Sequence, residues 1–341
     1  MKLTSVVVVL AILALTSFAH AEDKPIVLEG GDGPGKGKHI VLISGDQEYR
    51  SEEAIPLLAK MLNKHHGFKC TILFTVDPKD GTVNPNINNI PGLDALKTAD
   101  LMVIFTRFLN LPDDQLQHIA DYLAAGKPVV GLRTSTHAFN GIPAKSKFAH
   151  FNNGSGVKGW EGGFGKVVLG EKWVNHHGAH GKEGTRGIVA KDQEKHPILK
   201  GIAAGDIFGT TDVYTVTLPL PGDSAPLVLG EVTETLKPDS KAVSGKKNEP
   251  MMPVAWTKTY PGEGEKKGRA FTTTMGASQD FEFEGTRRLI VNGCFWSMGL
   301  ESKIPDKSKV DIVGEFKPTR FYFKKTEEWV KTPLKPADFF K

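Results

Sequence analysis

The sequence predicts an α/β protein with a flavodoxin-like, doubly wound and mostly parallel sheet that carries helices on both faces. Two observations lead to this prediction. Short β-branched runs alternate with helical patterns through the first half of the chain, and such alternation implies right-handed crossovers between parallel strands. In addition, the apolar run at 128–132 breaks abruptly into polar residues at 133–137, as a buried strand does where it reaches a sheet edge.

Four apolar runs supply the predicted parallel strands, which begin near His39, Cys70, Leu101 and Pro128. A helix follows the first strand, and we expect Ser51 to cap it because Glu52 and Glu53 occupy its first turn, where acidic residues favour the positive end of the helix dipole. A second helix is predicted to begin near Pro112 and to end at Gly126.

The second half of the chain is less regular. Glycine-rich sequence at 153–165 suits an active-site insertion. Regular structure is then predicted to return at 166–169, 214–218, 226–229, 254–257 and 269–273. A helix from Glu284 through Leu300 completes a domain that we place at 38–301. Residues 302–341 are rich in Lys and Pro and are expected to lie on its surface.

The first residues have the pattern of a secretory signal. An uninterrupted apolar run at 6–15 precedes Ala19-His20-Ala21, which is an A-x-A cleavage site. The run is shorter than the roughly 20 residues of a membrane-spanning helix. We therefore expect cleavage of the signal at 1–21, a flexible segment at 22–37, no later membrane segment, and a secreted or periplasmic protein.

The overall composition argues against some classes of partner. The 43 basic and 39 acidic residues are interspersed, so no basic stripe favours nucleic acid. Cys70 and Cys294 are too few for a disulfide scaffold. Export would permit the two to pair, but their apolar sequence contexts equally suit two buried thiols.

Polar residues after the strand from Pro128 are the first candidates for a site, because ligands collect beyond the carboxyl ends of strands in open α/β sheets. We expect Arg133 to clamp an anion or a hydroxyl. Ser135 is expected to bind substrate and His137 to take part in catalysis. A serine nucleophile is disfavoured, since Ser135 lacks the flanking glycines of a nucleophile elbow.

The loop after the first strand is the second candidate. It contains Asp46, Glu48 and Arg50 next to a helix N-terminus, which attracts polar ligands. Asp46 and Arg50 are predicted to bind substrate, and Glu48 to close the site as a catalytic group. A surface turn with capping acids explains the same residues equally well.

Three histidines within five positions form the third candidate, at His176, His177 and His180. Imidazole is a common metal ligand, but this spacing matches no motif of fixed metal geometry, and the glycines around it indicate a loop. We expect no cofactor, with His177 or His180 as the acid/base and Arg186 binding substrate. A metal-dependent hydrolase that uses the His176–His180 loop is an alternative.

Polar strand ends at 210–214 and 273–280 are the last candidates, although both can be ordinary turns. Asp212 is predicted to bind substrate. Because concave sites gather groups from several loops, we expect Arg133 and the histidine loop to share one site.

Several ordered segments together match the pattern of a known family. They are 44–46, 131–137, 196–198, 212–214, 253–256, 268–276 and 292–299. With these segments the chain resembles the trehalose-utilisation (ThuA-like) family. The resemblance implies a class I glutamine amidotransferase-like α/β fold and a role in catabolism of trehalose, related disaccharides or oxidised 3-keto sugars.

The chain departs from amidotransferases at the nucleophile. Those enzymes carry Gly-x-Cys-x-Gly, whereas here Arg133 stands at the Cys position of the segment 131–135. A guanidinium stays charged and cannot be that nucleophile, so we expect no glutamine hydrolysis. Many family members also have Gly-His where this chain has Gly276-Ala277, and others have a first-loop His where it has Glu48-Tyr49.

We therefore expect an exported protein that acts on or binds a small carbohydrate. Arg, His, Asp, Asn and Trp offer donors, acceptors and a stacking face to a polyhydroxylated ring. The competing hypothesis is a non-enzymatic binding or scaffold module, because a fold does not determine a function.

Overall fold

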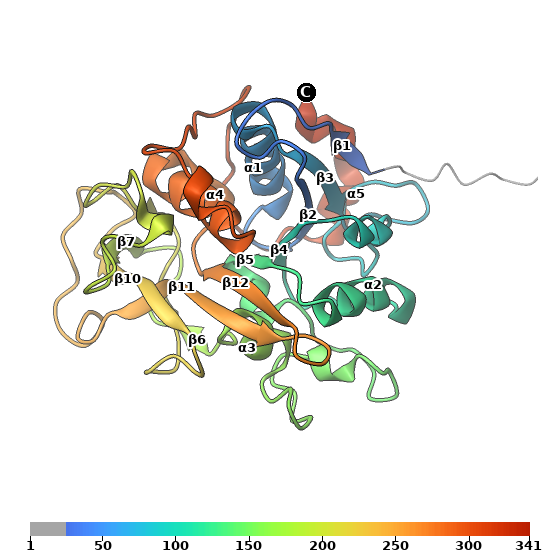
Figure 1. Cartoon of the computed structure of the whole chain (residues 1–341), viewed down its shortest axis with the longest axis horizontal. Coiled ribbons are helices and arrows are strands. Elements are labelled where there is room, and N and C mark those ends of the chain that lie inside the picture. Colours follow the sequence, from blue (N-terminus) through green and yellow to red (C-terminus); the bar gives the residue numbers. More distant parts are fainter. Residues whose placement is uncertain (1–24) are drawn as a thin grey trace, which may run out of the picture.

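The computed structural model describes residues 25–341. The predicted signal at 1–21 lies outside the described residues. Within them, a ten-stranded sheet runs through the molecule in the order β1-β3-β2-β4-β5-β12-β11-β10-β7-β8 (Figure 1). No helix among these residues has the length and apolar character needed to cross a bilayer.

The centre of the sheet is parallel. Its strands are β2 (His39–Gly45), β3 (Lys69–Phe74), β4 (Leu101–Thr106), β5 (Val129–Leu132) and β12 (Lys267–Thr273). The prediction that four parallel strands begin near His39, Cys70, Leu101 and Pro128 is confirmed. Burial on both faces explains their nearly continuous apolar sequences.

Antiparallel strands extend the sheet beyond β12 and at the opposite edge. They are β11 (Met252–Pro261), β10 (Ala225–Thr233), β7 (Gly184–Val189), β8 (Phe208–Gly209) and β1 (Ile26–Leu28). A separate two-stranded sheet joins β6 (Asn175–His176) to β9 (Tyr214–Thr215). β1 belongs to the segment expected to be flexible, and it pairs with β3.

Helices cover both faces of the parallel centre, with α1 and α4 above it and α2 and α3 below it in Figure 1. The helices are α1 (Ser51–His66), α2 (Asp113–Ala124), α3 (Gly163–Leu169), α4 (Glu284–Ser297) and α5 (Thr326–Lys331). Alternate residues of β2 enter two different cores. Ile40 and Leu42 pack in the α1 and α4 core, and Val41 and Ile43 in the α2 and α3 core.

Two local expectations need correction, and one expected regular element proves to be a helix. The residue before α1 is Arg50, with φ 60°, and Ser51 does not cap the helix; its hydroxyl instead accepts a hydrogen bond from the Asp46 amide at 2.9 Å. The apolar run at 166–169 lies in α3, because a short buried run has no period that separates helix from strand. The last long helix ends at Ser297 rather than at Leu300.

The two cysteines and the C-terminal segment also have defined places. Cys70 and Cys294 are buried free thiols, so of the two alternatives the one with two buried thiols is confirmed. The segment at 302–341 lies against α1 and the end of β3, where Phe339 stacks on Phe74 with ring centres 5.6 Å apart.

A matched pair of substitutions tests the placement of the core. Ile104 in β4 is fully buried, whereas Ile312 is 40% exposed. Ile104→Ala should lower the free energy of unfolding by about 2–5 kcal/mol because it leaves a cavity. Ile312→Ala should cost less than about 1 kcal/mol. Urea unfolding measures both, and equal costs would contradict the described core.

Candidate functional site

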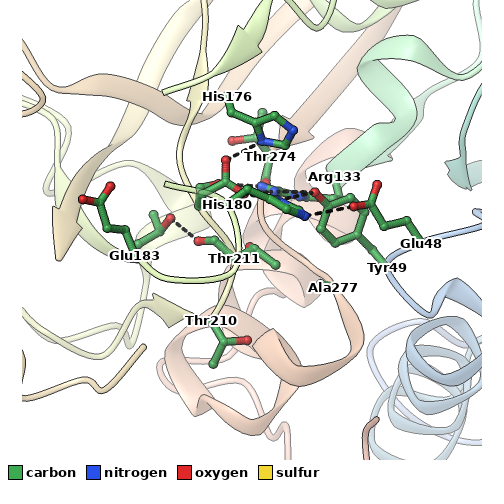
Figure 2. A network of polar contacts seen from close by, with 12 residues as sticks. Glu48, Tyr49, Arg133, His176, His180, Glu183, Thr210, Thr211, Thr274 and Ala277 are labelled. Atoms are coloured by element: carbon green, nitrogen blue, oxygen red, sulfur yellow. Dashed lines mark hydrogen bonds and ion pairs between the residues drawn. The ribbon is translucent and has the colours of Figure 1, made fainter. Parts of the chain in front are cut away.

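The site lies where β2 and β5 end and where two later loops reach the same edge of the sheet (Figure 2). Arg133 directly follows β5, and Asp212 comes shortly before β9. His176 lies on β6, which pairs with β9, and His180 lies in the following loop. The small β6–β9 sheet therefore holds the histidine loop beside Asp212.

Arg133 is the buried centre of this arrangement. Its Nη1 donates to the carbonyl oxygens of Asp212 (2.8 Å) and Thr274 (2.7 Å), and its Nη2 donates to the Tyr49 hydroxyl (3.1 Å) and Asp212 Oδ1 (2.9 Å). The guanidinium also lies 3.7 Å from the centre of the Tyr214 ring. With a fully buried side chain, Arg133 is not the ligand clamp that we expected.

Asp212 neutralises that buried cation. Its Oδ2 lies 2.7 Å from His176 Nδ1, and its Oδ1 lies 3.1 Å from His180 Nδ1. Burial alone would raise the pKa of Asp212, but the Arg133 guanidinium and the hydrogen bonds from both histidines hold it below its ordinary value. Asp212 is thus an ionised, fully buried carboxylate that orients two imidazoles.

His180 bridges two carboxylates. Besides Asp212, its Nε2 lies 3.1 Å from Glu48 Oε1, and Figure 2 shows the ring extending toward Glu48. The hydrogen bonds with Asp212 and Glu48 raise the pKa of His180 to about 9. The ring is therefore an imidazolium at neutral pH, with each nitrogen facing one carboxylate.

His176 differs from His180 because only one of its nitrogens is held. Nδ1 faces Asp212, whereas Nε2 has no hydrogen-bond partner among the described residues. The side chain is 36% exposed. A carboxylate that fixes one imidazole nitrogen and leaves the other free is the arrangement used in general acid–base catalysis.

A narrow pocket of about 20 Å³ adjoins these groups. This volume admits about one water molecule. Its walls include Glu48, Arg107, Phe108, His137, Trp173 and His176. Burial, with help from Arg107 and Arg133, keeps the pKa of His137 well below its ordinary value, so His137 adds a neutral imidazole to the wall.

Several predicted site residues serve the structure instead. Asp46 is buried and accepts hydrogen bonds from the Glu48 amide (2.6 Å), the Tyr49 amide and the Thr134 hydroxyl, which shapes the first loop. The Ser135 hydroxyl donates to the Ile104 carbonyl oxygen at 2.6 Å. Neither residue lines the pocket.

Three more predicted residues lie elsewhere. His177 Nε2 pairs with the Lys247 carbonyl oxygen at 2.7 Å. Arg186, on β7, pairs with Glu231. Arg50 lies beneath the C-terminal segment, 5.5 Å from the centre of the Trp329 ring. The expected juxtaposition of the first loop, the β5 turn and the histidine loop is found, but it is built from Glu48, Arg133, His180, Asp212 and His176.

Sequence reasoning did not select His176 as an acid/base, gave no role to Trp173 or Tyr214, and missed Arg107. The strand that holds His176 beside Tyr214 is only two residues long and ends at His176. The sequence around it therefore carries no pattern that separates His176 from His177.

His176, His180 and Asp212 can also be considered as metal ligands. One ligand atom from each lies within 4.8 Å of the others, and two histidines with one carboxylate are a common catalytic set. However, the Arg133 guanidinium lies 2.9 Å from Asp212 Oδ1, and its charge opposes a second cation on the same carboxylate.

Comparison with known proteins gives the class and then the family. The chain is a mixed α/β protein with a large sheet and covering helices, and the ThuA model, described as trehalose utilisation, matches residues 39–297. The chain therefore belongs to the ThuA family. No curated protein matches it.

Solved structures that resemble the chain include two ThuA-like proteins. A putative ThuA-like protein from Bacteroides uniformis is 15% identical, with 78% of this chain and 94% of that chain covered and a TM-score of 0.47. A putative ThuA-like protein from Parabacteroides merdae is also 15% identical, with 85% and 98% covered and a TM-score of 0.48.

The buried ion pair gives a stability prediction. Asp212→Asn keeps the shape of the side chain but leaves Arg133 as an uncompensated buried charge, which should cost about 3–5 kcal/mol in unfolding free energy. Asp223→Asn, at a half-exposed carboxylate, should cost less than about 1 kcal/mol. Urea unfolding measures both losses of unfolding free energy. A smaller loss for Asp212→Asn than for the control Asp223→Asn would contradict the role of Asp212.

The raised pKa of His180 gives a pH prediction. Folding moves this pKa from 6.5 to about 9, so the stabilising contribution is complete below pH 6.5 and is lost as the pH rises through about 9. The unfolding free energy of the wild type should fall over that window more than that of His180→Asn. If the unfolding free energies of wild type and His180→Asn changed with pH in the same way, the raised pKa of His180 would be refuted. An NMR titration midpoint near 6.5 for His180 would refute it too.

Proposed function

We propose that the protein binds a small carbohydrate over the narrow pocket and that His176 exchanges a proton with it. The observation that carries the proposal is the pairing of His176 Nδ1 with Asp212 at 2.7 Å while Nε2 remains free. Trp173 and Phe108 beside it offer apolar ring faces, and sugar rings combine such faces with hydrogen-bond donors and acceptors.

The proposed chemistry assigns different roles to the two histidines. His176 Nε2 accepts a proton from a sugar hydroxyl, or returns it to a developing oxyanion, while Asp212 holds the ring and stabilises the imidazolium. His180 stays charged between Glu48 and Asp212 and provides a fixed positive field. Because the pocket is smaller than a sugar ring, only a hydroxyl or a carbonyl oxygen enters it.

The substrate class rests on the family. The printed description is trehalose utilisation, and trehalose-like disaccharides and their 3-keto derivatives are the substrates we propose. A non-enzymatic binding module is the first alternative, since it requires the same surface without proton transfer. A metal-dependent hydrolase built on His176, His180 and Asp212 is the second, supported by their proximity.

Two finer proposals concern the fold and the location. The five parallel strands lie in the spatial order β3-β2-β4-β5-β12, which supports a flavodoxin-like, doubly wound arrangement. The apolar run at 6–15 and Ala19-His20-Ala21 support export with cleavage before Glu22, and N-terminal sequencing of exported protein tests this.

Substitution of two neighbouring histidines, one at a time, tests the proposed function. Trehalose and 3-keto-trehalose are incubated with the protein, and their conversion is followed by NMR. His176→Asn should lower the rate by about 10²–10⁴-fold while binding changes little. His177→Asn is the matched control and should leave the rate unchanged.

The remaining outcomes separate the alternatives. Calorimetric binding without conversion would support the binding module. Conversion abolished by a chelator and restored by zinc would support the hydrolase. Equal rates for wild type and His176→Asn would overturn the assignment of the acid/base.

A further inference from the structure

The C-terminal segment, which follows the matched residues 39–297, reaches the candidate site. The Phe321 ring lies 5.1 Å from the ring centre of Tyr49 and 5.0 Å from that of His180. The Tyr322 amide donates to the Glu48 carbonyl oxygen at 3.1 Å. Arg320 donates to the Gly181 carbonyl oxygen at 2.9 Å. The segment thus joins the first loop to the histidine loop.

Phe323, which follows Tyr322, places an aromatic ring beside Arg107. Phe323 is 54% exposed, and its ring centre lies 4.7 Å from the Arg107 guanidinium carbon. The same guanidinium lies 4.8 Å from the centre of the Phe108 ring. Because Arg107 and Phe108 line the pocket, the two rings and the guanidinium form a surface that is continuous with it.

The guanidinium of Arg107 makes only long contacts with acceptors in the protein. Its hydrogen bond to Gln47 Oε1 is long, at 3.4 Å, and its Nε lies 3.5 Å from Glu48 Oε2. By contrast, the two Nη atoms of Arg133 make hydrogen bonds of 2.7–3.1 Å within the protein. Arg107 therefore can donate to ligand hydroxyls without first losing strong internal contacts.

Backbone strain concentrates around this surface. Four non-glycine residues in the described part of the chain have positive φ, and three of them, Arg50, Phe108 and Arg133, lie in the loops around the site. Phe108 has φ 48°, a conformation that costs a bulky residue free energy and that often marks functional positions. Here it sets the direction of the ring that contacts Arg107.

We propose that Phe108, Arg107 and Phe323 form a subsite for one pyranose ring. The C–H face of the sugar packs on the phenyl rings while its hydroxyls accept hydrogen bonds from Arg107. A ring seated there places one oxygen into the adjoining pocket near His176. The proposal rests on the proposed function and adds that the C-terminal segment determines which sugar is bound.

Three substitutions at exposed positions test the subsite with trehalose and 3-keto-trehalose as probes in titration calorimetry of the full chain. Phe323→Ala should weaken binding about twofold to tenfold because a stacking face is lost. Phe323→Trp keeps an aromatic face and should bind within about twofold of wild type. Val330→Ala, on the same segment and 67% exposed, is the control and should not change binding.

The outcomes separate this inference from the function on which it rests. If wild type binds either sugar and Phe323→Ala binds equally well, the subsite is wrong and the proposed function stands. If wild type binds neither sugar, both are wrong. If Phe323→Ala and Val330→Ala weakened sugar binding equally, the effect would belong to the C-terminal segment as a whole. That result would also overturn the subsite.

Discussion

The site depends on one buried ion pair, between Arg133 and Asp212. A guanidinium taken out of water is tolerated only when a counter-charge and hydrogen-bond acceptors surround it. Arg133 follows a parallel strand, and its acceptors come from the loop before β9 and from the turn after β12. The pair therefore ties the parallel centre of the sheet to its antiparallel extension, and the rest of the site is built on that connection.

The same carboxylate serves stability and chemistry. Asp212 uses one oxygen for Arg133 and His180 and the other for His176. Because Arg133 keeps Asp212 ionised, Asp212 can hold both imidazoles in fixed orientations. Arg133 thus contributes a structural charge, and the imidazoles that Asp212 orients come from the later loop at 176–180.

Much of the sheet was predictable because its signals are local. Apolar runs that end in polar turns located β2, β3, β4 and β5, and alternation with helices predicted their parallel pairing. Contacts between distant residues were not predictable in this way. Nothing near Arg133 in the sequence shows that four acceptors converge on it, and nothing near His177 shows that it turns to Lys247. The short run at 166–169 lacked a period that could identify it as helical.

The position of the C-terminal segment has a consequence for specificity. Phe321 and Phe323 come from chain that follows the matched family region. Phe321 packs on Tyr49 and His180, which are partners of Arg133 and Asp212, whereas Phe323 packs on Arg107, which shares no hydrogen bond with that pair. Substitutions far from a network and without shared partners have nearly independent effects. Phe323 can therefore be substituted with little effect on the buried pair, so the proposed sugar subsite can vary separately from the ion pair that holds the site together.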